Sequence, residues 1–391
     1  MSYRFQLTTA TVILLTATSL QSLGQVASTP IKIGGQDVIK LERTASDQQN
    51  HPEFLSITVL QGRGMNLLQI SAFVPGRGET NIFYSPPIEE AAKLLSNEGD
   101  DEFGNENFKI GGAFLVPYAN RIRGKLSADG KTITSQWENK TLILPANWGG
   151  SNPGAEQHSI HGLINKRQVD QLKRQIRGDI QVVTGVIHAG DFGGRWPSKT
   201  DLEIRITLSK DYVSASITAK NVGTEDEPIG IGWHPYFNIP SGYRKQAQLY
   251  LPAVKVAEIN NYDEDFPTGK LIDVTNTKWD FNKDGGKPLG DIYLDDNFNQ
   301  LTRKNGNVIA EITDPAAHYG IRITSSSKEV NTIQVYAPLN KPFLAVEEQF
   351  NVNDPFGKEW KGHDNGMITL KPGQSVTWKD QLELFVPQLE R

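Results

Sequence analysis

The sequence predicts an all-β protein, a large antiparallel β-sandwich with one or two short helices. Short runs of β-branched and aromatic residues recur between clusters of Gly, Pro, Asn and Asp, a pattern typical of many strands joined by turns. The clearest pair of runs, residues 203–208 and 212–218, is separated by only three residues, which predicts an antiparallel hairpin. No internal repeat stands out, and this argues against propellers and solenoids.

Other elements follow from the same kind of pattern. We expect one helix over residues 88–95, because two prolines precede it and two glutamates in its first turn complement the helix dipole. Further strands are expected at residues 131–137, 308–312, 320–325, 332–337 and 376–384. Two segments rich in Gly and Trp, residues 147–159 and 188–200, are expected to be loops of the kind that build binding sites on a rigid sheet.

The N-terminal segment predicts export. The first residues carry a positive charge, and residues 7–20 form an apolar stretch that is too short to span a bilayer. We therefore interpret residues 1–24 as a secretory signal peptide, cleaved near Gln25 or Ala27, and residues 25–391 as one domain. The expected location is periplasmic or extracellular. The chain has no cysteine, which fits an exported protein and excludes disulfides, thiolate metal sites and cysteine nucleophiles.

The charge pattern narrows the range of partners. The formal net charge is -5, and the 40 Lys and Arg residues are scattered rather than clustered with aromatic residues. Nucleic acid and, after signal removal, membranes are therefore not expected as partners. A small neutral molecule suits this balance better, and the chain is expected to be a monomer or a dimer.

One histidine interrupts an apolar, aromatic run at residues 230–239 that predicts a strand. Alternation along an extended chain places Gly230, Gly232, His234 and Tyr236 on one face, and we expect the two glycines to leave room there for a ligand. Such a histidine is either a hydrogen-bonded core residue or a group that takes part in chemistry. The strand alone leaves both interpretations open.

A second apolar strand, residues 342–350, carries two adjacent carboxylates that point to opposite faces. Glu347 shares its face with Gln349, and this polar pair indicates the more open side, whereas Glu348 lies with apolar neighbours. A buried carboxyl with a raised pKa and a histidine that titrates near neutral pH form a candidate general acid and base. The alternative is a strand edge that carries solvated charges.

Five ordered motifs resemble those of the aldose 1-epimerases, the galactose mutarotases. They are GGAFLVPYANRIRG at residues 111–124, HSIHG at 158–162, GWHPYFN at 232–238, LDDNF at 294–298 and VEEQ at 346–349. The resemblance extends over the whole mature chain, through residues 368–378. It implies the large antiparallel β-sandwich of that family, with a sugar bound in a cleft on the concave face of one sheet, and it implies no cofactor and no metal.

The resemblance also implies catalytic and sugar-binding roles. Glu347 matches the carboxylate that takes the proton from the anomeric hydroxyl, and His234 matches the histidine that protonates the ring oxygen. Arg121, His161 and Asp295 match residues that bind sugar oxygens. Ring opening, rotation about the C1–C2 bond and reclosure then exchange the anomers, and this requires two proton-transfer groups on opposite sides of the hemiacetal.

Two acidic neighbours of these residues leave alternatives open. Asp296 follows Asp295 in the chain, where the family often has a histidine, so either aspartate could face the cleft. Glu348 stands where many relatives have a small residue or proline. Its charge would raise the pKa of Glu347 by like-charge repulsion.

Several other residues have both a functional and a structural interpretation. Arg123 is a second sugar contact or ordinary surface charge, and Trp148 and Trp196 either stack on a sugar or cover the core. His158 and His161 have a spacing that can bind a metal, but no third ligand is evident. We therefore expect no metal between the two histidines.

Residues 280–291 match the opening of a calcium loop, in which oxygen ligands alternate around a turn. Helices are not expected on either side, and Asp291 replaces the usual bidentate glutamate. We interpret the segment as a turn between strands, and the sequence leaves calcium binding open.

Taken together, the residues and the resemblance predict an exported isomerase, an aldose 1-epimerase that interconverts the α and β anomers of a free neutral hexose or pentose. Hexose phosphates are disfavoured, because Arg121 and Arg123 are the only basic pair inside a motif. One alternative is a non-catalytic exported carbohydrate-binding protein on the same sandwich, and another is a structural domain of a larger sugar-processing assembly. The presence of both His234 and Glu347 favours the enzyme.

Overall fold

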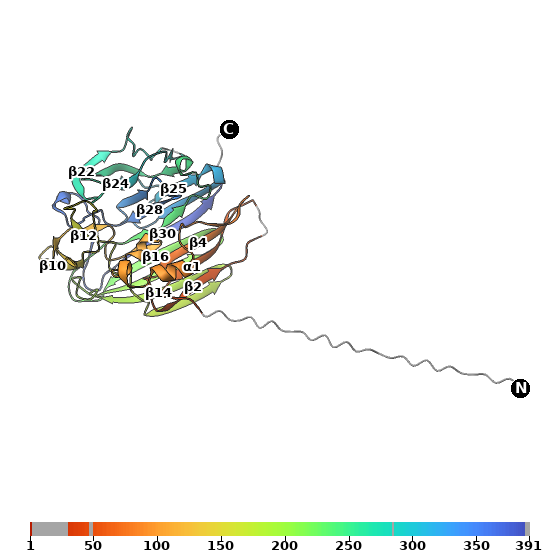
Figure 1. Ribbon diagram of the computed structural model, residues 1–391, viewed down its shortest axis with the longest axis horizontal. Coiled ribbons are helices and arrows are strands. Elements are labelled where there is room, and N and C mark those ends of the chain that lie inside the picture. Colours follow the sequence, from red (N-terminus) through yellow and green to blue (C-terminus); the bar gives the residue numbers. More distant parts are fainter. Residues whose placement is uncertain (2–29, 47–49, 284, 388–391) are drawn as a thin grey trace. The chain divides into compact units, whose positions relative to one another are not determined.

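Three antiparallel sheets of nine, six and five strands carry the fold of this computed structural model (Figure 1). The nine-stranded sheet has the order β13 (Gln171–Arg177), β14 (Ile180–Gly190), β15 (Thr200–Leu208), β16 (Tyr212–Asn221), β30 (Ser375–Phe385), β26 (Tyr319–Ser325), β25 (Val308–Asp314), β20 (Gln248–Tyr250) and β23 (Lys287–Pro288). The six-stranded sheet has the order β19 (Tyr236–Asn238), β28 (Phe343–Gln349), β27 (Thr332–Ala337), β24 (Leu294–Leu301), β21 (Ala253–Ile259) and β22 (Pro267–Asp273). The five-stranded sheet runs β1 (Lys32–Ile33), β2 (Gln36–Glu42), β3 (Glu53–Leu60), β4 (Asn66–Val74) and β5 (Gly78–Asn81).

Smaller elements complete the fold and carry several of the sequence motifs. Short sheets are formed by β10 (Lys140–Pro145), β9 (Thr132–Trp137) and β8 (Lys125–Leu126); by β11 (Trp148–Gly149), β12 (Gln157–Ile160) and β7 (Arg121–Ile122); by β18 (Gly232–His234) and β6 (Ala113–Leu115); and by β17 (Glu227–Ile229) and β29 (Ile368–Leu370). The helices in the described part of the chain are α1 (Ile88–Leu94) and α2 (Glu106–Lys109), together with 3₁₀ turns at Gly99–Asp101, Arg244–Gln246, Pro315–Ala317 and Lys358–Trp360.

The main hydrophobic core lies between the nine-stranded sheet and the other two large sheets. Ile206 of β15 and Ile57 of β3 belong to it, as do Leu382 of β30 and Val346 of β28, and all four are buried. Burial of apolar side chains on facing sheets is the main stabilising contribution in a sandwich. A backbone bridge from Phe83 to Phe237 links the segment after the five-stranded sheet to the edge of the six-stranded sheet.

The structure confirms the fold class and most of the elements expected from the sequence. The run at residues 230–239, expected to be one strand, forms two short strands, β18 and β19, that belong to different sheets. The 203–208 and 212–218 runs are β15 and β16, which pair antiparallel across the expected short turn. The remaining expected strands are β9, β25, β26, β27 and β30. Helix α1 starts at Ile88, as expected, and ends one residue early, at Leu94. The segment 147–159 is less irregular than expected, because it contains β11 and most of β12.

The structure describes residues 1, 30–46, 50–283 and 285–387, and residues 31–391 form one compact unit. The expected signal peptide, residues 1–24, lies outside the described residues apart from Met1. Within the described ranges, no helix is long and apolar enough to cross a bilayer.

Candidate active site

A cavity of about 530 Å³ lies against the six-stranded sheet, on the face turned away from the main core. The alternation of β28 explains why this face is available. Leu344 and Val346 point into the core, whereas Phe343 and Glu347 line the cavity. All five residues expected at the site line this one cavity: Arg121, His161, His234, Asp295 and Glu347.

His234 and Glu347 lie side by side in the cavity floor. The Nε2 atom of His234 lies 3.6 Å from Oε1 of Glu347, and the two residues are 6 % and 1 % exposed. They come from β18 and β28, which belong to different sheets. Gln349 donates a hydrogen bond of 2.8 Å to Oε2 of Glu347, so the second carboxylate oxygen is held while the first faces the imidazole.

The glycines beside His234 allow other side chains to pack closely against the backbone. They do not leave room for a ligand, so that expectation was wrong. A Cβ atom on Gly230 would lie 2.0 Å from Oδ1 of Asn351, and one on Gly232 would lie 2.9 Å from Cγ of Gln349. A larger residue at either position would therefore require the packed side chains of Asn351 or Gln349 to move. Their function is to let the strand that carries His234 approach β28.

His161 reaches the cavity from the turn that follows β12. Its ring lies 4.8 Å from that of His234 and 4.7 Å from that of Phe108, in edge-on geometry. The backbone of His161 is left-handed, with φ of 60°, a conformation that costs free energy in any residue other than glycine and occurs most often at functional sites. Gly162 continues the turn with φ of 75°, and a Cβ atom there would lie 2.4 Å from the carbonyl oxygen of Val116.

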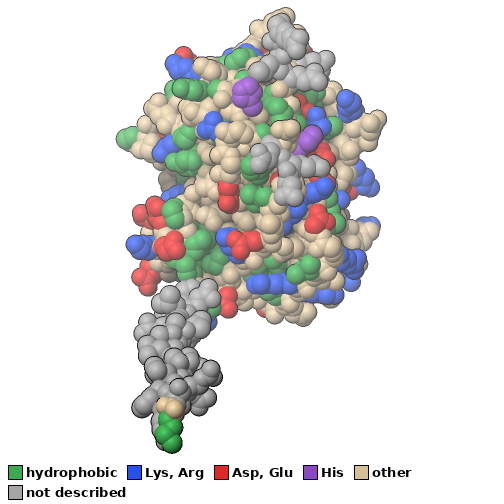
Figure 2. All heavy atoms as spheres, turned by 90° about the vertical axis from the view of Figure 1, so that its right-hand side faces the viewer, with side chains coloured by type: hydrophobic (Ala, Val, Ile, Leu, Met, Phe, Trp, Pro, Cys, Tyr) green, Lys and Arg blue, Asp and Glu red, His purple; other side chains and the backbone are tan. Residues whose placement is uncertain are grey.

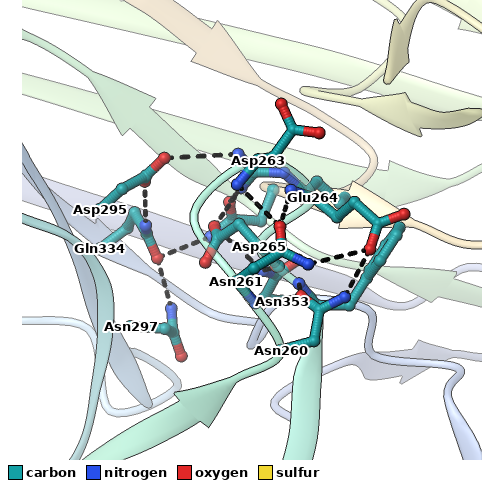
Figure 3. A network of polar contacts seen from close by, with 12 residues as sticks. Asn260, Asn261, Asp263, Glu264, Asp265, Asp295, Asn297, Gln334 and Asn353 are labelled. Carbon is teal, nitrogen blue, oxygen red and sulfur yellow. Dashed lines mark hydrogen bonds and ion pairs between the residues drawn. The ribbon is translucent and has the colours of Figure 1, made fainter. Parts of the chain in front are cut away.

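Arg121 lies between two carboxylates. Its Nη1 donates to Asp265, and its Nη2 donates to Oδ2 of Asp295 at 3.5 Å. Asp265 is itself held by Asn353, and these residues lie together in Figure 3. Burial alone would lower the pKa of Arg121, but the carboxylates of Asp265 and Asp295 outweigh it and raise the pKa. The guanidinium is therefore charged and fixed in direction.

A chain of amide groups connects the arginine side of the cavity to the catalytic pair. Gln334 donates to Oδ1 of Asp295 at 2.8 Å and accepts from Asn297 at 3.1 Å (Figure 3). Asn120 donates to Gln334 at 3.2 Å and to Gln349 at 3.1 Å. Because Gln349 holds Glu347, the network fixes the side chains of one sheet face relative to one another before any ligand binds.

Burial controls the protonation of the catalytic pair. Burial, with a smaller contribution from the charge of Arg121, lowers the pKa of His234 to about 4. Burial also raises the pKa of Glu347 well above its ordinary value, and the charge of Asp295 adds to this effect. Burial therefore disfavours the charged form of both groups and favours a neutral pair, with neutral His234 and the proton on Glu347. His161 is neutral as well, because burial lowers its pKa far below 6.5.

Glu348 points away from the cavity, into the core. Its carboxyl forms a hydrogen bond with that of Asp380 on β30, and both residues are 1 % exposed. Two carboxyls can share such a bond only if one of them carries a proton. The raised pKa of Glu347 results from burial and from Asp295, so the effect that we expected from Glu348 is not the cause.

The structure also separates the alternatives for the second aspartate and for Arg123. Asp295 lines the cavity, whereas Asp296 is buried beneath it and accepts from the hydroxyl of Tyr262 at 3.1 Å. Arg123 does not line the cavity. It forms ion pairs with Glu156 and Glu359 at 3.2 and 3.1 Å.

The two tryptophans have different positions. Trp148 lines the cavity, as expected for a stacking surface. Trp196 does not, because it is 4 % exposed, stacks on Tyr118 and donates to the carbonyl of Pro228. The segment 188–200 therefore covers the core, and the interpretation of its tryptophan as a sugar contact is wrong.

No cluster of described residues has the geometry to hold a metal ion. His158 is fully buried, and its Nδ1 faces the carbonyl oxygen of Glu156 at 3.2 Å. In the segment 280–291, which matches the opening of a calcium loop, Asp280 pairs with Lys283 at 3.1 Å and Asp291 pairs with Lys245 at 2.6 Å. The aspartates at the two ends of this segment are thus paired with lysines. Residue 284 lies outside the described residues.

Sequence reasoning missed two groups of residues that line the cavity or support its lining residues. The first is polar and supports the predicted site: Asn120, Asp265, Gln334 and Asn353. The second is aromatic and lines much of the cavity wall: Tyr84, Phe108, Tyr262, Tyr293, Tyr336 and Phe343. Asn120 directly precedes Arg121 inside the motif at residues 111–124, so its position in that motif could have predicted its place at the site. The others lie outside the motifs and are brought in by the fold.

The surface charge agrees with a small neutral ligand. On the face shown in Figure 2, acidic and basic side chains are interspersed. Such a mixed surface does not attract polyanions over a long range.

Comparison with solved structures shows the same fold. A galactose mutarotase-like protein from Clostridium acetobutylicum is 18% identical and has a TM-score of 0.67, over 90% of this chain and 99% of the other. An aldose epimerase homologue from C. elegans is 16% identical with a TM-score of 0.65, and a galactose 1-epimerase from Lactobacillus acidophilus is 17% identical with a TM-score of 0.61, each over 90% of this chain and 99% of the other. A search of curated proteins by sequence gives no match.

The sequence profile of the aldose 1-epimerase family matches residues 89–383. This range contains all five residues expected at the site from the sequence and most of the six- and nine-stranded sheets. The chain belongs to the aldose 1-epimerase family.

Proposed function

We propose that the protein is a mutarotase that interconverts the α and β anomers of a free aldose by acid and base catalysis. The observation that carries this proposal is the contact between His234 and Glu347, two buried titratable groups at the floor of a cavity large enough for a sugar. General acid–base catalysis needs such groups within hydrogen-bonding reach of the atoms that exchange protons.

Ring opening requires one proton to leave the anomeric hydroxyl and another to reach the ring oxygen. Once the proton of Glu347 has moved to His234, the Glu347 carboxylate takes the proton from O1, the C1–O5 bond breaks as the C1 carbonyl forms, and O5 takes a proton from the His234 imidazolium. The pair ends with the proton on Glu347 and with neutral His234. That is the form favoured in the empty cavity. Rotation about C1–C2 and the reverse transfers then give the other anomer.

The remaining polar residues bind and orient the sugar. Arg121 presents charged donors of fixed direction toward sugar oxygens. Asp295 accepts from hydroxyls at the far side of the ring, and His161 is a neutral imidazole that can donate or accept. Because these groups are held before binding, little conformational entropy is lost when the sugar enters.

The substrate that fits this site is a neutral monosaccharide, a hexose or a pentose. The charge of Arg121 is already balanced by Asp265 and Asp295, so the cavity floor does not offer the concentrated positive charge that a sugar phosphate requires.

The test is the rate of anomeric equilibration of freshly dissolved α-glucose, α-galactose and α-xylose, followed by polarimetry with and without the protein. We expect at least one of these sugars to reach equilibrium faster in proportion to protein concentration. Calorimetric titration with the same sugars separates this proposal from a carbohydrate-binding protein. Binding of a sugar without any acceleration of its mutarotation would support the binding protein and overturn the enzyme.

A further inference from the structure

Two loops from different sheets meet at one wall of the catalytic cavity. Residues 150–156 join β11 to β12 in a short three-stranded sheet, and residues 260–266 form a turn that joins β21 to β22 in the six-stranded sheet. Ser151 of the 150–156 loop and Asp263 of the 260–266 turn both line the cavity. The contact between the loop and the turn is therefore part of the cavity wall.

The carboxylate of Asp263 joins the loop to the turn. Its Oδ1 accepts from the backbone N–H and from the hydroxyl of Ser151, each at 2.7 Å, and its Oδ2 accepts from the backbone N–H of Asn152 at 3.1 Å. The bonds from Ser151 and Asn152 lower the pKa of Asp263 below its ordinary value, so the carboxylate is charged near pH 7. Both of its oxygens are engaged by the 150–156 loop, and we call these three hydrogen bonds the clasp.

The neighbours of the clasp show how closely the loop and the turn approach. A Cβ atom on Gly150 would lie 2.3 Å from Oδ2 of Asp263 and 2.6 Å from Cβ of Ala155. A larger residue at position 150 would therefore push one of these groups away. Glu264, the residue after Asp263, accepts from the backbone N–H of Glu156 at 2.8 Å. Two adjacent carboxylates of the turn thus bind backbone donors of the loop.

Hydrogen bonds within the 260–266 turn connect the clasp to Arg121. Oδ1 of Asn261 accepts from the backbone N–H groups of Asp263 and Glu264, each at 2.9 Å. The N–H of Asp265 donates to the carbonyl of Asn261, also at 2.9 Å. Asp265 in turn accepts from Nη1 of Arg121, and Asp263 and Asp265 both lie on this turn in Figure 3. The turn is thus an internally bonded unit that carries both the clasp and the carboxylate partner of Arg121.

The 150–156 loop leads to Arg121 from the other side. It continues into β12, and Ile160 of β12 pairs in register with Arg121 of β7. The clasp therefore links the strand beside Arg121 to the turn that holds its guanidinium. A change in the distance between the loop and the turn would move the backbone of Arg121 relative to Asp265.

We propose that Asp263 is a positioning residue for sugar binding, because the clasp fixes Arg121 in place before the sugar enters. This inference rests on the proposed mutarotase function. Order that is present before binding does not have to be created when the sugar binds, so the clasp strengthens binding. Glu347 lies on β28 and is held by Gln349, outside the loop and the turn. The clasp should therefore affect KM rather than kcat.

The test measures Asp263→Ala by polarimetry with the preferred aldose and by calorimetric titration with the same sugar. We expect KM and Kd to rise about threefold to tenfold and kcat to stay within about twofold of wild type, because the loop and the turn must then be ordered on binding. Asp263→Asn keeps one acceptor oxygen and should give an intermediate KM. Gly150→Ala displaces the carboxylate without removing it and should also raise KM.

A double-mutant cycle tests whether the clasp acts through Arg121. Arg121→Lys should raise KM by itself, since an ammonium group lacks the planar fork of the guanidinium. Adding Asp263→Ala to Arg121→Lys should then raise KM little further. If Asp263→Ala multiplies KM by the same factor in both backgrounds, the clasp does not position Arg121 and the inference is wrong.

Asp129→Ala is the matched control. Asp129 is an exposed carboxylate that accepts from the hydroxyl of Ser127 at 2.6 Å and from the N–H of Lys131 at 3.1 Å, in a turn that does not line the cavity. Its removal should leave KM and kcat unchanged. If the wild-type protein accelerates a sugar and Asp263→Ala keeps the wild-type KM, or lowers kcat instead, the clasp is wrong while the mutarotase proposal stands. If the wild-type protein accelerates no sugar, the proposed function itself fails.

Discussion

The imidazole of His234 and the carboxylate of Glu347 lie 3.6 Å apart, at the floor of one cavity, on strands of two different sheets. Each residue alone has an ordinary structural interpretation, since buried histidines and strand glutamates are common. Their contact, the depressed pKa of the histidine and the raised pKa of the glutamate give the pair a chemical function.

The first prediction concerns the pH dependence of catalysis. As pH falls through about 4, His234 takes up a proton, the pair then holds two protons and no base remains. As pH rises past the raised pKa of Glu347, the pair loses its last proton and no acid remains. We therefore expect kcat/KM, corrected for the uncatalysed reaction, to fall as pH drops through about 4 and to fall again only above the raised pKa of Glu347. A rise in kcat/KM with pH centred at 6.5, the ordinary value for histidine, would contradict this account of the pair.

The second prediction concerns stability and the buried carboxyls Glu348 and Asp380. In the unfolded chain both ionise near pH 4, whereas burial raises the pKa of Asp380 to about 7 and also raises that of Glu348. Between these values the native state binds more protons than the unfolded state. The stabilisation linked to this proton is complete below pH 4 and is lost as pH rises toward 7, by about 1.4 kcal/mol per pH unit for one proton.

Glu348→Gln tests this linkage, because the amide donates to Asp380 without a titrating proton. Its free energy of unfolding, measured in urea, should rise relative to the wild type between pH 5 and 8. Asp380→Asn should behave in the same way. If the differences from wild type do not change with pH, the two carboxyls do not share a proton in the native protein.

The third prediction separates the structural role of Arg121 from its role in binding. Arg121→Met leaves Asp265 buried without its cation, and we expect the free energy of unfolding to fall by about 3–5 kcal/mol. Adding Asp265→Leu removes the unpaired charge and should restore much of the loss in a double-mutant cycle in urea. The double variant should still bind sugar poorly, because the guanidinium is missing. If the single and double variants lose the same free energy of unfolding, the unpaired Asp265 is not the cause of the loss.

The fourth prediction concerns the turn that carries His161. Gly162→Ala would place a Cβ atom 2.4 Å from the carbonyl oxygen of Val116, at a left-handed φ. Gly178 is a matched control, since it has φ of 62° and no atom within 4 Å of an added Cβ. Gly178→Ala should cost about 1–2 kcal/mol of unfolding free energy, and Gly162→Ala should cost more and raise KM as well. Thermal or urea unfolding measures the free-energy cost of each variant. If the two costs are similar, the close contact with Val116 does not add to the cost of a side chain at Gly162.

The sequence predicts the sheets well, because strand periodicity is a local signal. Residues 332–337 and the hairpin of 203–208 with 212–218 correspond closely to β27, β15 and β16. The same alternation correctly separated Glu347 from Glu348, since neighbouring residues of a strand face opposite sides. Sequence pattern thus placed Glu347 on the side of β28 that lines the cavity and Glu348 on the opposite side.

The supporting residues depend on contacts between distant segments, which periodicity does not report. Asp265 lies in a loop with left-handed φ and reaches Arg121 from 144 positions away in the chain. Trp148 and Trp196 occur in similar Gly-rich segments. Only the tertiary packing determines that Trp148 lines the cavity and that Trp196 is buried in the core. The expectation that Gly230 and Gly232 leave room for a ligand fails for the same reason. The side chains that pack against them come from Asn351 and Gln349, which are distant in the chain.

The most direct test of the central claim compares the two adjacent carboxylates of β28. Glu347→Gln and Glu348→Gln make the same chemical change one residue apart, on opposite faces of the strand. Measured by polarimetry with the preferred aldose near pH 6, we expect Glu347→Gln to lower kcat about 10²–10⁴-fold, whereas Glu348→Gln stays within a few-fold of wild type. Full activity of Glu347→Gln would contradict the assignment of the proton-transfer pair.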